Sequence, residues 1–245
     1  QIGGLRPQIN CSVCNTGDIH INGMEGSYSM VVIDGMPIMG GLSTVYGIQG
    51  IPTSLIQQIE VIKGPASTLY GSEAMAGLIN VVTKSIDCIP NVSYDFNISS
   101  WGEFQNSLSF KIVDNKKLKA YTAIDVFNYN NPVDNNNDNF TDLTLRNRYS
   151  IFNKFKFLPT NKDANAFNIS LRYFNENRWG GEMDWKEEFR GSNQLYGESI
   201  LTNRIELSTA YQFPAKEKLN WQTSFSLHDQ KSWYGTTNYD ANQFI

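Results

Sequence analysis

The chain has 245 residues, of which 40% are hydrophobic and 18% charged, and its formal net charge is -4 at pH 7. The length permits one or two domains with a sizeable core, and the acidic balance excludes the basic face that nucleic-acid binding needs. No run of 18 apolar residues occurs, which excludes a transmembrane helix but not membrane strands, whose alternating side chains keep mean hydropathy low.

The chain ends suggest a fragment. The chain starts at Gln1 without a signal-like segment, and its last residues, NYDANQFI, contain no terminating element. We therefore expect an internal piece of a longer protein.

The first third of the chain is rich in glycine. Of the 19 glycines, 13 precede residue 86, a density that indicates turns and close backbone approach in a compact α+β domain. The pattern predicts a buried strand over 29–33 that ends in an Asp34-Gly35 turn, a short helix over 53–58, and strands over 59–63 and 78–84.

From residue 91 onward, apolar and polar residues alternate with a period of two, which indicates strands with one polar face. About seven strands are predicted, over 92–98, 104–112, 118–126, 143–157, 167–173, 205–213 and 221–227. Each approaches the roughly 9 to 11 residues that cross a bilayer at a tilt.

Three features favour a membrane barrel over a soluble sandwich. The polar face carries Asn, Ser, Thr, Gln and occasional Arg, which suits a hydrated lumen. Short connections (113–117, 158–164, 213–218) alternate with long ones (128–142, 175–197), with 101–104 as an exception. Aromatic residues expected at the membrane interfaces are Trp101, Phe104, Tyr129, Phe155, Phe157, Tyr211, Phe213 and Trp233. Seven strands cannot close a barrel, so we expect further strands beyond Ile245.

Residues 18–84 resemble the TonB-dependent transporters. The match lies in DIHINGMEG, SMVVIDGMPI and IPTSLIQQIEVIKGPASTLYGSEAMAGLINVVTK, which looks like the second half of that family's plug domain. The resemblance implies an α+β plug domain over 1–86, followed over 87–245 by antiparallel transmembrane β-barrel strands of an incomplete barrel. It also implies an outer-membrane location in a Gram-negative bacterium.

The resemblance further implies active import rather than enzymatic catalysis. The expected ligand is an iron-siderophore, haem or cobalamin, because Gly64-Pro65 is typical of that class and not of the glycan importers. Expected partners are the TonB-ExbB-ExbD energy-coupling complex, outer-membrane lipids and, as an option, a surface lipoprotein. One departure is Asn22, where the family commonly has an Arg that contacts barrel carboxylates.

In this family, plug loops and extracellular loops hold the ligand. The candidate plug contacts are Asn15, Met36, Met39, Leu42, Ser43, Thr44 and Tyr46, most of them in the apolar, glycine-rich segment 37–47. The loop candidates are Trp179, Met183 and Trp185.

Two metal sites are considered, and no other cofactor is expected. Cys11 and Cys14, with nearby methionines, suit copper(I), but a lone CxxC favours a structural disulfide or a pair of loop thiols. The spacing of Asp134, Asp138 and Asp142 resembles a calcium loop, but Asn139 replaces the expected glycine and no Glu closes the loop, which favours a solvated loop. Copper uptake and a non-transporting barrel that acts as an adhesin or a lipoprotein partner remain alternative functions.

Overall fold

The N-terminal region, which the resemblance predicts to be a plug domain and which keeps that name below, contains a four-stranded sheet. The structure, a computed structural model, describes residues 3–11, 16–38, 50–160, 165–214 and 219–244. The sheet consists of β4 (Met36–Pro37), β3 (Ser29–Ile33), β6 (Gly77–Thr83) and β5 (Ile56–Lys63), in that order. Strands β3 and β6 are parallel, and the other neighbours are antiparallel. All three strands predicted in this region are therefore present.

The predicted Asp-Gly turn joins β3 to β4. Asp34 and Gly35 both have positive φ, 50° and 78°. A two-residue hairpin loop with two such residues is the type I′ turn, which Asp-Gly favours.

The helix expected over 53–58 is wrong beyond its first turn. Thr53–Leu55 form the 3-10 helix η2, and β5 begins at Ile56. Ile56 and Gln58 pair with Thr83 and Val82 of β6, so the hydrogen bonds of the sheet override the local helix preference.

The remaining plug elements are short. Strands β1 (Leu5–Cys11) and β2 (Thr16–Ile21) form a separate antiparallel hairpin. The helical turns are η1 (Gly26–Tyr28), α2 (Ser67–Tyr70), η3 (Ser72–Ala74) and η4 (Ile86–Cys88). Within the described ranges, no helix is long and apolar enough to cross a membrane.

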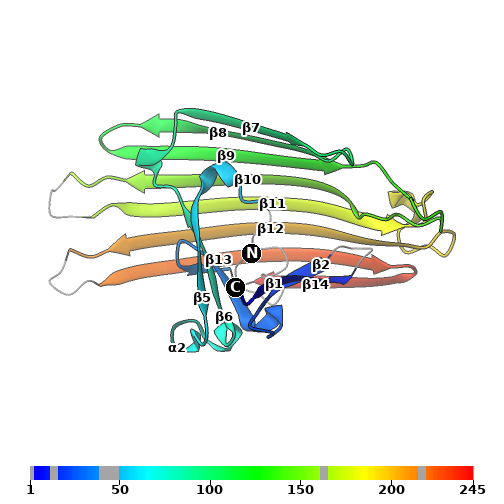
Figure 1. The fold of residues 1–245 in the computed structure, drawn as a ribbon. Coiled ribbons are helices and arrows are strands. Elements are labelled where there is room, and N and C mark those ends of the chain that lie inside the picture. Colours follow the sequence, from blue (N-terminus) through cyan, green and yellow to red (C-terminus); the bar gives the residue numbers. More distant parts are fainter. Residues whose placement is uncertain (1–2, 12–15, 39–49, 161–164, 215–218, 245) are drawn as a thin grey trace.

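The rest of the chain is one antiparallel meander of eight strands, which we call the wall (Figure 1). Its strands are β7 (Val92–Ile98), β8 (Phe104–Asp114), β9 (Leu118–Tyr129), β10 (Leu145–Phe157), β11 (Phe167–Gly181), β12 (Gly197–Gln212), β13 (Asn220–Tyr234) and β14 (Thr237–Phe244). Neighbours in sequence are neighbours in the sheet. All seven predicted strands are present, and β14 is an eighth that the alternation did not predict.

The faces of the wall are inverted relative to a soluble protein. Apolar side chains of one parity are exposed, with Val92 at 65% and Leu108 at 39%, whereas polar side chains of the other parity, such as Asp125 at 0%, are buried. A hydrated, protein-filled interior and an apolar exterior are what a membrane barrel requires. We call these the inner and outer faces.

The two ends of the wall differ in their connections. At the short-turn end, residues 115–117 join β8 to β9. At the long-loop end, residues 130–144 and 182–196 join β9 to β10 and β11 to β12. Two connections at the long-loop end are short. One is the connection near 101–104, which the sequence already marked as an exception, and the other is the two-residue turn 235–236.

An apolar cluster joins the plug domain to the wall. Leu55, Ile86 and Ile89 of the plug side pack with Tyr121, Ala123 and Phe152, which point inward from β9 and β10. Tyr129 also points inward and is 2% exposed. Its prediction as an outer interfacial residue is therefore wrong, because the register places it opposite Arg146 on the inner face.

Candidate functional site

The Asp34 turn is tied to the wall by an ion pair. Lys154 Nζ on the inner face of β10 lies 2.8 Å from Asp34 Oδ2 and also contacts the Thr83 hydroxyl. Asp34 accepts hydrogen bonds from the Thr83 backbone N–H and hydroxyl, both at 2.7 Å. One carboxylate thus joins the ends of β3 and β6 to the wall.

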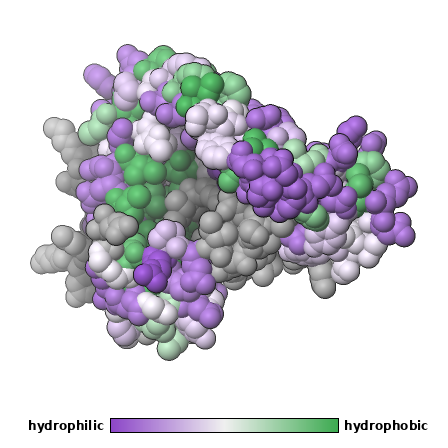
Figure 2. Space-filling model, turned by 45° about the vertical axis from the view of Figure 1, so that its right-hand side comes forward, coloured by the Kyte–Doolittle hydropathy of each residue, from purple (hydrophilic) through white to green (hydrophobic). Residues whose placement is uncertain are grey.

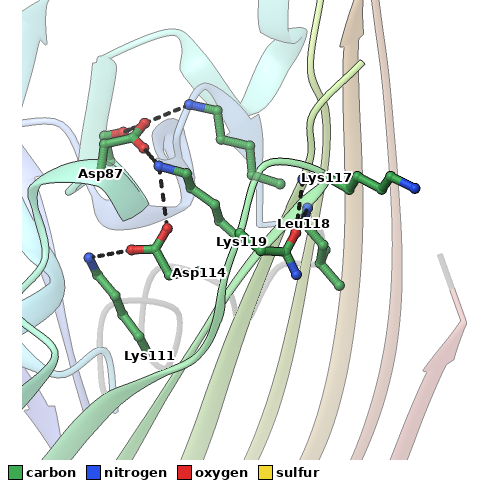
Figure 3. Close-up of polar contacts among 9 residues, drawn as sticks. Asp87, Lys111, Asp114, Lys117, Leu118 and Lys119 are labelled. Carbon is green, nitrogen blue, oxygen red and sulfur yellow. Dashed lines mark hydrogen bonds and ion pairs between the residues drawn. The ribbon is translucent and has the colours of Figure 1, made fainter. Parts of the chain in front are cut away.

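A second carboxylate anchors the segment between the plug domain and β7. Asp87 pairs with Lys156, at 2.7 Å, and with Lys119, and Lys119 also lies 3.5 Å from Asp114 Oδ1 (Figure 3). Lys111 pairs with the other oxygen of Asp114 at 3.0 Å. The network lies at the short-turn end, where the chain passes from the plug domain into the wall.

In both contacts, the wall supplies the cation, and the carboxylate comes from the plug domain or from the segment that follows it. The resemblance implied the opposite polarity, in which an Arg of the plug domain, at the position of Asn22, contacts carboxylates of the barrel. Asn22 itself has φ 53° and donates its backbone N–H to the Gly4 carbonyl at 2.7 Å. Asparagine tolerates this left-handed turn better than a long side chain does, so the position has a turn role here.

Hydrogen bonds from Lys119 and Lys156 hold the pKa of Asp87 well below its usual range. A depressed carboxyl pKa adds stability above the unfolded-state value of about 3.9, and this stability is lost as the pH falls through that range. We expect Asp87→Asn to destabilise the full-length protein by about 1 kcal/mol or less at pH 7, because the carboxylate is partly exposed and screened.

Thermal unfolding of the full-length protein in detergent at pH 7, 5 and 3 would measure the destabilisation by Asp87→Asn. The difference between Asp87→Asn and the wild type should persist at pH 5 and shrink at pH 3. A difference that grew on acidification would contradict the ion-pair assignment.

Arginines crowd the inner face toward the long-loop end. Arg148 of β10 lies 3.2 Å from the buried Asp125 and 4.0 Å from Glu176, and Arg178 also pairs with Glu176. Arg146 stands out because it forms no ion pair within the described ranges. Its guanidinium lies 4.3 Å from the centre of the Phe127 ring, a cation–π contact.

The Nε atom of Arg146 is buried and has no hydrogen-bond partner among the described residues. An arginine held by an aromatic ring and without an ion pair among the described residues is suited to an anionic ligand.

A second charged group lies farther along the same face. Arg172 and Arg204 both pair with Glu206, at 3.1 and 2.6 Å. The two groups together contain five arginines and three carboxylates. The alternation indicated an occasional inward Arg, but it did not show that β10, β11 and β12 bring these arginines side by side.

A cavity of about 350 Å³ lies between the β3–β4 hairpin and the wall, beside the place where β4 contacts β13. The plug side includes Met36, Pro37 and Ile38. The wall side includes Ser170, Ser208, Ser224 and the Arg172–Glu206 pair. Met36 is the one predicted plug contact that falls within the described ranges. Asn15, Met39, Leu42, Ser43, Thr44 and Tyr46 lie outside them.

The predicted loop residues come together at the long-loop end. Trp179, Met183 and Trp185 line a pocket of about 240 Å³ between loops 130–144 and 182–196. Trp185 is 6% exposed and lies on Gly197, where an added Cβ would come within 2.4 Å of the indole nitrogen. Trp179 belongs to the outer face, alternate with the inward Arg178. In Figure 2, hydrophilic residues gather on the right, the side that holds these loops in Figure 1.

The aspartates of the long loop bind their own backbone. Asp134 accepts the N–H groups of Asp138 and Asn139, Asp138 accepts that of Phe140, and Asp142 accepts that of Asn135. Among the described residues, no three His, Cys, Asp or Glu side chains form a group suited to a metal. Cys14 and the Cys11 side chain lie outside the described set, so the copper hypothesis stays a prediction, as does calcium.

Comparison with known proteins identifies the N-terminal part. The TonB-dependent Receptor Plug Domain family matches residues 2–78. The chain is similar to the ferric yersiniabactin uptake receptor FyuA from Yersinia pestis, with 16% identity, a TM-score of 0.68, and coverage of 99% of this chain and 40% of that one.

Two further solved structures are similar at lower coverage. The siderophore receptor PiuA from Acinetobacter baumannii has 13% identity, a TM-score of 0.62, and coverage of 94% and 33%. The closed form of the ferric-catecholate import receptor Fiu from E. coli K12 has 17% identity, a TM-score of 0.61, and coverage of 94% and 34%.

These likenesses show the fold. The chain spans between 33% and 40% of the length of these structures. Residues 2–78 are a TonB-dependent receptor plug domain, and the wall is the incomplete barrel that accompanies it. TonB-dependent receptors are outer-membrane proteins of Gram-negative bacteria.

Proposed function

We propose that this TonB-dependent receptor fragment belongs to a protein that imports an anionic ferric siderophore across the outer membrane. The observation that carries the proposal is the inward arginine group around Arg146, which lies on the route from the long-loop end toward the plug domain. Iron chelates built from catecholate or carboxylate ligands carry negative charge, and a partly dehydrated arginine binds such oxygens strongly.

The comparisons support the same ligand class, because the similar structures are named as receptors for ferric siderophores. In this proposal, the TonB-ExbB-ExbD complex drives the import, and the plug domain closes the barrel between import events. Haem, cobalamin and copper are competing ligands, and an adhesin or lipoprotein partner is the competing class of function.

Uptake by a deletion strain tests the proposal. The strain is complemented with the full-length receptor and supplied with radiolabelled ferric enterobactin, ferric yersiniabactin, a neutral ferric hydroxamate, haem, cobalamin or copper. We expect energy-dependent accumulation of an anionic ferric siderophore only in the complemented strain. Accumulation of haem, cobalamin or copper alone would show that the ligand is that compound and not a ferric siderophore. Equal accumulation in both strains would overturn the import function.

A further inference from the structure

A row of aromatic side chains crosses the outer face of the wall at the short-turn end. It consists of register partners on four neighbouring strands, Phe157, Phe167, Tyr211 and Trp221. The ring centres of Phe157 and Phe167 lie 6.3 Å apart, as do those of Phe167 and Tyr211. Trp221 is 53% exposed. In membrane barrels, aromatic girdles lie at the interfaces and short turns on the periplasmic side, so this row marks the level of the periplasmic headgroups.

The turn between β8 and β9 lies directly beyond this aromatic row. Leu118 is the register partner of Phe157 and continues the row onto β9. The next residue toward the turn, Lys117, accepts the backbone N–H of Leu158 at its carbonyl oxygen, at 2.8 Å. The Asn115 side chain accepts the backbone N–H groups of Lys117 and Leu118, both at 2.8 Å. These hydrogen bonds hold the turn at a fixed level beside the headgroups.

The carboxylate that precedes this turn is occupied by other lysines. Asp114 pairs with Lys111 at 3.0 Å and with Lys119 at 3.5 Å. Lys116 and Lys117 in the turn are both exposed, and neither forms an ion pair with another described residue. Figure 3 shows the Lys117 side chain extending away from the Asp114 network. Two adjacent ammonium groups are thus presented at the headgroup level without a carboxylate partner from the described part of the chain.

We propose that Lys116 and Lys117 form a docking surface for the phosphate groups of anionic phospholipids in the periplasmic leaflet. Charge complementarity supports this partner, because each lysine near an anionic membrane surface strengthens the attraction by roughly fivefold. The level of the turn favours a lipid over a soluble anion, since the aromatic row beside it marks the membrane interface. The inference goes beyond the proposed import function and does not depend on the imported ligand, because it needs only the outer-membrane location.

Lipid retention by the full-length receptor tests the inference. The receptor is assembled in nanodiscs of phosphatidylglycerol and phosphatidylcholine, extracted and washed, and the retained lipids are quantified by mass spectrometry. We expect Lys116→Gln combined with Lys117→Gln to lower the enrichment of phosphatidylglycerol by at least about tenfold. Lys186→Gln combined with Lys231→Gln removes two exposed lysines at the long-loop end and should match the wild type.

Salt and a conservative variant separate charge from shape. Washing in 1 M salt, where the screening length is about 3 Å, should remove the difference between the wild type and the glutamine variant. Lys116→Arg combined with Lys117→Arg should keep the enrichment, because arginine also binds phosphate. Loss of the enrichment in the arginine variant, or equal enrichment in the wild type and the glutamine variant, would overturn the inference.

A measurement on the unmodified receptor removes any dependence on the folding of variants. Phosphatidylglycerol with a photoreactive headgroup should label the peptide that contains residues 115–118 more strongly than the matching phosphatidylcholine does. Equal labelling by the two lipids would contradict the docking surface. A peptidoglycan stem peptide is the acidic competitor in solution. If it bound the wild type and not the glutamine variant while the phosphatidylglycerol enrichment stayed unchanged, the partner would be an acidic peptide and the inference would fail.

Discussion

Replacing Lys154 by glutamate is expected to loosen the plug domain and make the full-length barrel leaky. The new carboxylate would face Asp34, whose Oδ2 lies 2.8 Å from Lys154 Nζ. Both side chains are partly buried, at 16% and 32% exposure. Loss of the pair and the new repulsion should therefore cost about 1 to 3 kcal/mol, between the values for exposed and buried pairs. That corresponds to roughly a fivefold to 150-fold larger population of the loosened state.

Single-channel conductance in planar bilayers measures this effect. Opening events should be rare in the wild type, more frequent in Lys154→Met and most frequent in Lys154→Glu. Adding Asp34→Asn to Lys154→Glu should reduce them, because the amide oxygen still accepts the Thr83 N–H while the repulsion disappears. Lys231→Glu makes the same charge change at an exposed position of β13 and should behave as the wild type. Equal leakage in both charge reversals would remove the specific role of the Asp34 contact.

Replacing Arg146 by alanine is expected to weaken the binding of an anionic chelate by roughly tenfold to hundredfold. Hydrogen bonds to charged groups contribute about 1.5 to 3 kcal/mol, and each 1.4 kcal/mol is a factor of ten in affinity. The protein itself should tolerate the change, because Arg146 forms no ion pair within the described residues and stacks only on Phe127.

Binding to the purified receptor, measured by quenching of intrinsic fluorescence, separates charge from shape. A trianionic ferric tris-catecholate should lose affinity in Arg146→Ala and recover part of it in Arg146→Lys, whereas a neutral ferric tris-hydroxamate should change little. Arg190→Ala is the control, since Arg190 pairs with Glu187 and stacks on Trp233 in the outer loop region. Equal loss for both chelates would place Arg146 in a structural role.

The sequence predicted those parts of the fold in which the alternation of apolar and polar residues matches the two faces of the strand. Strands β7, β8 and β10 combine exposed apolar residues with mainly polar inward ones, so a period of two locates them. The type I′ turn at Asp34-Gly35 was predictable because few residue pairs tolerate two positive φ angles.

Prediction failed where the outer face of a strand changes from apolar to polar residues along its length. Residues 175–181 were assigned to a loop, yet they continue β11. Their outward residues include Asn175 and Asn177, so the apolar half of the alternation disappears while the strand hydrogen bonds persist. The plug anchors were missed for another reason. Asp34 lies 120 residues from Lys154 in sequence, and no local pattern reports which inward lysine a distant turn will meet.

The outward asparagines also indicate where the lipid-facing part of the wall ends. Asn128 bonds to Asn147 at 2.8 Å and Asn175 to Asn203 at 2.6 Å, each pair across neighbouring strands just beyond exposed Tyr149 and Tyr173. Amide pairs of this kind are poorly suited to contact with lipid tails. From Asn175 to Gly181, β11 extends roughly 20 Å at about 3.3 Å per residue. We expect this stretch to stand above the lipid tails, so that an arriving chelate meets a walled entrance before it reaches their depth.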